Sequence, residues 1–249
     1  LLKVKILFRN NCLIFTVEGK PICTVKHHIL TEHYTALAIF DIRYIFYDFV
    51  KLTGVIPILL IFRLKTYCFN KKKKELFNEP VIVVSNHITY SDIIVLLTTF
   101  WNKRVSFLAK DELFSSFIGN LFFKSVKAIP IQNHNIEVKT FKKAKNEIEH
   151  GHLVALFPEG HIKKQEGLDT FKSGAVLLAL MCDVPIVQVY IQEKKSWKER
   201  QRVMFGNKIN VKDYFSSNTP TIDEINKVTQ MLYEHELELA NKMESIINK

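Results

Sequence analysis

Short apolar runs rich in β-branched residues recur along this chain, and polar turns or helix-like segments separate them. A run that is apolar throughout but too short for a helix is typical of a strand buried on both faces of a sheet. Strands that alternate with helices favour parallel pairing. The sequence therefore predicts an α/β fold with a mainly parallel central sheet flanked by helices. The runs are Val81–Val84, Val105–Ala109, Leu153–Phe157 and Val184–Ile191.

A polar turn from Asn86 to Asp92 follows the first of these runs. Open α/β sheets bind their ligands at the carboxyl ends of strands, so His87 is expected at such an edge. An imidazole can take a proton from a hydroxyl near neutral pH, and a carboxylate can orient the ring and stabilise its protonated form. His87 and Asp92 are residue types that suit this pair. The alternative is a capping box of Thr89 and Asp92, in which the carboxylate only satisfies a backbone amide.

The turn resembles the first motif of the glycerolipid acyltransferase family, Asn-His-x-Ser-x-x-Asp, with Asn86, His87, Thr89 and Asp92 at the motif positions. This family includes the 1-acylglycerol-3-phosphate acyltransferases. Other segments resemble further family motifs in the same order, and the resemblance extends from Phe46 to Ile209. These segments are Ala109–Phe114, Ala128–Ile131, Phe157–Gly160, Phe171–Ala175 and Val184–Val187.

The resemblance implies an enzyme that transfers a fatty acyl group from a thioester, acyl-CoA or acyl-acyl carrier protein, to the hydroxyl of a lysophospholipid. It implies that His87 is the base and that Asp92 orients it, with neither a resident cofactor nor a metal. The expected acceptor is 1-acylglycerol-3-phosphate, which would give phosphatidate. The positions implied in substrate binding are Asn86, Thr89, Lys110, Phe157, Pro158, Glu159, Gly160 and Lys172.

Two positions depart from the family pattern. The second motif usually ends in Asp-Arg, where this chain has Gln132-Asn133, and the usual Thr-Arg after the third motif is His161-Ile162. Both arginines that grip an acceptor phosphate are therefore replaced. Lys163, Lys164 and Lys172 are the nearest cations that could hold the phosphate instead. The alternatives are a lysolipid with another head group and a catalytically inactive lipid-binding relative.

Residues 44–74 are predicted to form an interfacial membrane-binding segment. Tyr44 to Phe62 is almost continuously apolar, but its uncharged part is too short for a confident transmembrane helix. Lys71 to Lys74 follow, and a polybasic cluster beside an apolar segment favours an anionic cytoplasmic leaflet. The expected location is therefore membrane-associated, on the cytoplasmic face. The alternative is a buried helix followed by a solvated lysine loop.

The formal charge of +10 implies a polyanionic partner, either a nucleic acid or an anionic membrane. The sequence contains no recognition motif for nucleic acid, and the basic run adjoins an apolar segment, so the membrane is the expected partner.

Residues 1–43 are expected to be a separate β-rich extension, before an acyltransferase domain at 44–249. Turn signals divide Val4 to Val25 into two or three short antiparallel strands. His27, His28 and His33 lie close together, but they lack a helix-spaced carboxylate partner, so a metal site there is not favoured. No function is assigned to this extension.

Overall fold

The computed structural model describes residues 4–9, 12–17, 20–26, 45–70, 72–131, 138–162, 168–194, 196, 199–217 and 219–248. The chain divides into two compact units, Leu1–Phe49 and Val50–Lys249. The boundary falls inside helix α2 (Ile45–Phe62), which begins close to the expected start of the second domain.

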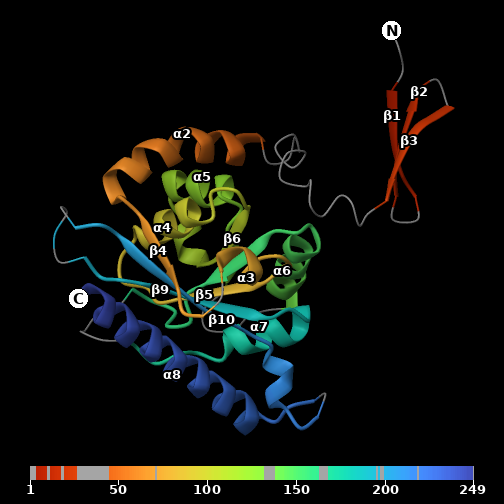
Figure 1. The fold of residues 1–249 in the computed structure, drawn as a ribbon. Helices are drawn as coiled ribbons and strands as arrows, with labels where there is room; N and C mark the ends of the chain where they lie inside the picture. The colour runs from red at the N-terminus through yellow and green to blue at the C-terminus, as the bar shows by residue number, and fades with distance from the viewer. Residues whose placement is uncertain are drawn as a thin grey trace. The chain divides into compact units, whose positions relative to one another are not determined.

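The first unit contains a three-stranded antiparallel sheet with the strand order β1-β2-β3 (Figure 1). The expected short antiparallel strands are confirmed. His27, His28 and His33 lie outside the described residues. The strands are β1 (Val4–Arg9), β2 (Cys12–Val17) and β3 (Lys20–Lys26).

The second unit is built on a seven-stranded sheet with the strand order β4-β10-β9-β5-β8-β6-β7. The five strands from β9 to β7 are mutually parallel, whereas β10 runs antiparallel to β9 and parallel to β4. The predicted α/β fold with a mainly parallel sheet is therefore confirmed. The strands are β4 (Lys65–Cys68), β5 (Ile82–Ser85), β6 (Val105–Lys110), β7 (Ile129–Ile131), β8 (Leu153–Leu156), β9 (Ile186–Ile191) and β10 (Arg202–Ile209).

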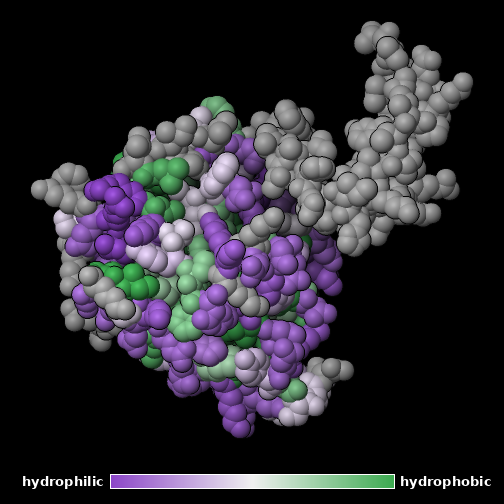
Figure 2. All heavy atoms as spheres, in the orientation of Figure 1, coloured by the Kyte–Doolittle hydropathy of each residue, from purple (hydrophilic) through white to green (hydrophobic). Residues whose placement is uncertain are grey.

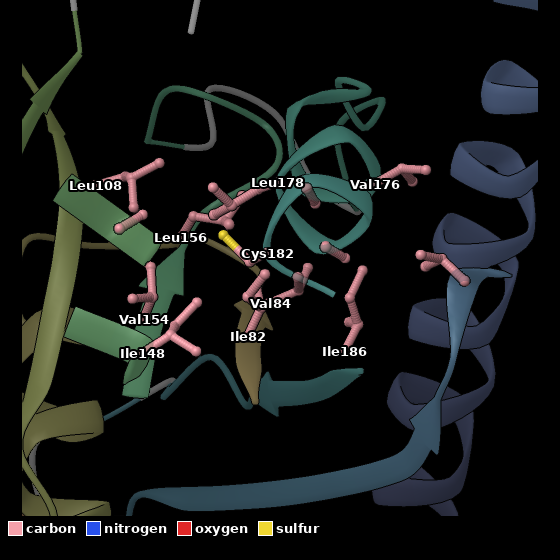
Figure 3. Close-up of a cluster of buried hydrophobic side chains, with 14 of the residues drawn as sticks. Ile82, Val84, Leu108, Ile148, Val154, Leu156, Val176, Leu178, Cys182 and Ile186 are labelled. Atoms are coloured by element: carbon pink, nitrogen blue, oxygen red, sulfur yellow. The ribbon is translucent and has the colours of Figure 1, made fainter. Parts of the chain in front are cut away.

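Helices cover both faces of this sheet, which explains why its central strands are apolar at successive positions. Side chains alternate between the two faces of a strand. Ile82 and Val84 of β5 pack on one face with α6 (Val138–Glu149), α7 (Gly174–Cys182) and α8 (Ile222–Ile247), and Figure 3 shows part of this core. Val81 and Val83 pack on the opposite face with α3 (Lys73–Leu76) and α4 (Asp92–Thr99).

The other described helices complete the second unit. Helix α5 (Phe117–Ser125) begins after the short 3₁₀ helix η3 (Asp111–Phe114), and η4 (Val211–Tyr214) follows β10. Phe141, Ala144 and Ile148 form a buried apolar stripe on α6.

Strand β4 was not expected from the sequence. It is an edge strand that pairs only with β10 among the described strands, and three of its four residues are exposed. It therefore lacks both the apolar run of a central strand and a regular alternation of burial. Its partner β10 runs antiparallel to β9, so the sheet is mixed at this edge.

The expected membrane segment becomes α2, β4 and α3 in the structure. Among the described residues, no helix combines the length and the hydrophobicity needed to cross a bilayer. The prediction that Lys71–Lys74 together face a membrane is wrong for Lys73. Its ammonium donates to the Thr99 carbonyl and lies 5.2 Å from the ring centroids of Phe100 and Phe205, and its burial lowers its pKa. Lys71 and the side chain of Lys74 lie outside what the structure describes.

Candidate active site

The predicted pair of His87 and Asp92 meets at the carboxyl end of β5. His87 Nδ1 lies 3.0 Å from Asp92 Oδ2. Because a carboxylate can only accept, this contact places the proton on Nδ1 and leaves the lone pair on Nε2. The His87 side chain is 13% exposed, so the ring is largely held by protein but reaches the surface.

Asp92 also organises the turn that carries His87. Its Oδ2 accepts from the backbone amides of Ile88 at 2.6 Å and Thr89 at 2.8 Å, and its Oδ1 accepts from the Thr89 hydroxyl at 3.1 Å. The capping alternative therefore describes part of the geometry, although the helix N-cap is Ser91 and the Asp92 amide donates to the Thr89 carbonyl. One carboxylate both closes the turn and orients the imidazole.

The neighbouring strand β8 delivers the predicted Phe157–Gly160 motif to the same edge. The rings of His87 and Phe157 stack with their centroids 4.0 Å apart and an interplanar angle of 15°. Glu159 is buried, and its Oε1 accepts from the His87 backbone amide at 3.3 Å. Two motifs that are far apart in the sequence thus converge because β5 and β8 are adjacent and parallel.

Asn86 connects this turn to the strand on the other side of β5. Its Nδ2 donates to the Ile191 carbonyl at 2.9 Å, and its Oδ1 accepts from the Ile191 amide at 2.7 Å. Asn86 is only 1% exposed. These contacts favour a role in positioning the turn over the substrate contact predicted for Asn86.

Gly160 and Lys172 lie against each other at the end of the Phe157–Gly160 motif. Gly160 has a φ of +73°, and a Cβ at this position would lie 2.8 Å from Lys172 Nζ. The Lys172 amide also donates to the Pro158 carbonyl at 2.9 Å. A side chain at Gly160 would therefore strain the backbone and displace the lysine ammonium.

The structure places the other predicted binding residues around the same edge. Thr89 is exposed, and its hydroxyl also lies 2.7 Å from Ser91 Oγ. Lys110 is exposed at the carboxyl end of β6, whereas Pro158 is buried.

Of the two positions that replace the family arginines, Ile162 lies within the described residues and Asn133 does not. Ile162 is half-buried, and His161 Nε2 lies 2.9 Å from Asp169 Oδ2. Gln132, Asn133, Lys163 and Lys164 lie outside the described residues. Of the three lysines expected to hold a phosphate, only Lys172 can therefore be located, beside the Glu159 turn.

Sequence reasoning missed two buried polar residues behind the turn, Gln188 of β9 and Glu236 of α8. Gln188 Nε2 donates to Glu236 Oε2 at 3.0 Å. The signal for Glu236 is its position, since a glutamate stands on the apolar stripe formed by Val228, Leu232 and Leu239. Among the described residues, no three His, Cys, Asp or Glu side chains gather as a potential metal site.

Comparison with known proteins decides the family. Residues 68–192, about half of the chain, match the family model described as Acyltransferase. The chain belongs to this family. It is therefore an acyltransferase, and the resemblance of its motifs is confirmed.

Two relatives of this acyltransferase carry the name 1-acyl-sn-glycerol-3-phosphate acyltransferase. The protein from Bacillus subtilis (strain 168) is 25% identical over 171 residues, which cover 66% of this chain and 83% of the relative. The protein from Streptococcus pneumoniae (strain ATCC BAA-255 / R6) is 27% identical over 154 residues, which cover 59% of this chain and 57% of the relative.

The fold also resembles a solved structure. The crystal structure of the 1-acyl-sn-glycerophosphate (LPA) acyltransferase PlsC from Thermotoga maritima matches with a TM-score of 0.52 and 17% sequence identity. The match covers 85% of this chain and 90% of that chain. At this identity, the likeness supports the fold.

Proposed function

We propose that this acyltransferase moves a fatty acyl group from acyl-CoA or acyl-acyl carrier protein to the hydroxyl of 1-acylglycerol-3-phosphate, which yields phosphatidate. The observation that carries the proposal is the 3.0 Å contact between His87 Nδ1 and Asp92 Oδ2 at the carboxyl edge of a parallel sheet. The names of the relatives support this acceptor. The proposed reaction uses only these two substrates and needs no resident cofactor.

In the proposed reaction, His87 Nε2 takes the proton of the acceptor hydroxyl as its oxygen attacks the thioester carbonyl. The new ester C–O bond forms, the C–S bond breaks, and the imidazolium returns the proton to the leaving thiolate. Asp92 stabilises the imidazolium and fixes the tautomer, while Phe157 limits rotation of the ring through its stacking contact.

The hydrogen-bond donors that stabilise the developing oxyanion are part of the proposal. The amides of Ile88 and Thr89 already donate to Asp92. The backbone amides in the first turn of α4, after Asp92, are the proposed donors, because helix N-termini present amides without intrahelical partners.

For the acceptor phosphate, we propose lysine contacts in place of the family arginines. Lys172 lies against Gly160, beside the Glu159 turn, and a lysine supplies a point charge rather than a bidentate fork. The second candidate is a lysolipid with another head group, which the replacement of both arginines favours.

The test is acyl transfer from labelled acyl-CoA and acyl-acyl carrier protein to lysophosphatidate and lysophosphatidylcholine. We expect a higher kcat/KM for lysophosphatidate, and a kcat lowered by roughly a thousandfold or more in folded His87→Ala protein. Asp92→Asn should lower kcat by a similar or smaller factor, since it disturbs the tautomer and the turn.

Circular dichroism and thermal unfolding of both variants are the control for folding. Full activity in folded His87→Ala protein would refute the role of the base. A clear preference for lysophosphatidylcholine would refute the acceptor and leave the acyl-transfer chemistry intact.

A further inference from the structure

A carboxyl group is completely buried directly behind the His87 turn. Glu236 of α8 is 0% exposed, and its Oε2 accepts from Gln188 Nε2 of β9 at 3.0 Å. The same Gln188 nitrogen donates to the Leu232 carbonyl of α8 at 2.6 Å. This glutamate therefore lies at the contact between the last helix and the sheet, on the core side of the strands.

Glu236 also interacts with both turns of the proposed active site. The backbone amide of Asn86 acts on it as a hydrogen-bond donor, and the charge of Glu159 acts on it from the end of β8. Asn86 in turn is fixed to Ile191 at the end of β9. The carboxyl group of α8 thus interacts with both the segment before His87 and the Glu159 turn.

The surroundings of Glu236 favour its neutral form. Burial, with repulsion from Glu159 as a further cause, raises the pKa of Glu236 to about 8, although the donors Gln188 and Asn86 act in the opposite direction. Tyr190, on the same strand as Gln188, has its pKa raised to about 12 by burial and by the charges of Glu236, Glu244 and Glu193. Among the described residues, the ionisable groups that interact electrostatically with Glu236 are Glu159 and Tyr190.

We propose that Glu236 is a positioning residue for acyl transfer, which holds the His87 and Glu159 turns together as a neutral acid and disturbs them when it ionises. The inference rests on the proposed function, because it assumes that His87 performs the chemistry. Ionisation would put a second carboxylate near Glu159, and both residues are at most 1% exposed. Two such charges are costly unless they are paired or the structure opens. The repulsion would act on the Glu159 carboxylate, whose Oε1 accepts from the His87 backbone amide.

The predicted effect on stability has a definite sign. The folded-state pKa of Glu236 is raised above its ordinary value of 4.5 to about 8. The neutral glutamate therefore contributes stability that is complete below pH 4.5, declines as the pH rises, and is lost once the pH passes about 8. Glu236→Gln, which keeps the shape and cannot ionise, should remove this decline. The stability of the variant relative to the unchanged protein should grow with pH over this interval and then level off.

The kinetic test compares kcat across pH 6 to 10 for the unchanged protein, Glu236→Gln and Glu236→Ala. The matched control is Glu238→Gln, which changes a glutamate on the exposed side of the same helix. We expect kcat of the unchanged protein and of Glu238→Gln to fall as the pH rises through about 8. In Glu236→Gln this alkaline decline should be absent. Glu236→Ala, which removes one of the two acceptors of Gln188 Nε2, should lower kcat roughly ten- to hundredfold with little change in KM, because misplaced catalytic groups affect mainly the chemical step.

The outcomes separate this inference from the proposed function. An alkaline decline that persists in Glu236→Gln, or that is missing from the unchanged protein, would overturn the positioning role while the loss of activity in His87→Ala still supports the chemistry. A folded Glu236→Ala variant with unchanged kcat would also overturn it. If His87→Ala retains full activity, the proposed role of His87 as the base fails, and the pH dependence of unfolding in Glu236→Gln still reports whether the buried acid is neutral.

Discussion

At the scale of single residues, the proposed site depends on groups that each serve two purposes. Asp92 closes the turn through two backbone amides and also contacts His87. Phe157 fills space beside the sheet and also stacks on the imidazole. The sequence predicted that His87 and Asp92 meet, because both belong to one short turn. It could not predict that the Asn86 carboxamide pairs with Ile191, since that contact depends on β9 lying beside β5.

Gly160 offers a prediction with a matched control elsewhere in the chain. Gly160 and Gly151 both have a positive φ, +73° and +77°, but only a Cβ at Gly160 would meet Lys172. Substitution by alanine should therefore lower the unfolding free energy by about 1–2 kcal/mol at either position. Only Gly160→Ala should also lower kcat/KM for lysophosphatidate, because it displaces the Lys172 ammonium.

Denaturant unfolding and steady-state kinetics of the two glycine variants measure these effects. Equal kcat/KM values in Gly160→Ala and Gly151→Ala would show that the contact between Gly160 and Lys172 has no part in acceptor recognition.

At the scale of helices and strands, local patterns predicted most of the sheet but not its antiparallel edge. Strands β5, β6, β8 and β9 were predicted because each is a short apolar run that helices cover on both sides. Strand β4 was missed because most of its side chains are exposed, so only its pairing with β10 makes it a strand. Glu236 was missed because its burial depends on a tertiary contact. Gln188 of β9 donates to its carboxyl group, and the local sequence of α8 does not show this contact.

Helix α8 begins with a capping box, which can be tested by itself. The Thr221 hydroxyl accepts from the Glu224 amide, and Glu224 Oε2 accepts from the Thr221 amide at 2.8 Å. Thr221→Ala should lower the unfolding free energy by about 1 kcal/mol, whereas Thr221→Ser should lower it much less because serine keeps the acceptor.

Urea unfolding of the two Thr221 variants supplies the comparison. If serine and alanine prove equally destabilising, the effect comes from the lost methyl group and not from the cap.

At the scale of the whole molecule, the excess positive charge is unevenly placed. An open hollow of about 590 Å³ between α5, β7 and α6 is lined by five lysines, Lys124, Lys127, Lys139, Lys142 and Lys143. Its acidic residue Glu147 is engaged with Ser106 and His152. In Figure 2, hydrophilic residues gather around α6.

Phe117 and Leu121 of α5 are 84% and 58% exposed, and with Lys124 they follow helical spacing along one side of the helix. Exposed apolar side chains beside lysines suit an anionic bilayer.

Vesicle binding tests whether these lysines and apolar side chains bind a membrane, since the inward position of Lys73 weakens the case for the Lys71–Lys74 cluster. Changing Lys139, Lys142 and Lys143 to Gln should weaken binding to anionic vesicles by about 1 kcal/mol per lysine and reduce its salt dependence. Phe117→Ser with Leu121→Ser should weaken binding to anionic and neutral vesicles alike, because it removes apolar contact rather than charge. Lys227→Gln with Lys242→Gln, on exposed positions of α8, is the control for net charge. An equal loss per lysine in the two sets would mean that overall charge governs binding. Unchanged vesicle binding with poorer transfer from acyl-acyl carrier protein would assign the hollow to the acidic donor instead.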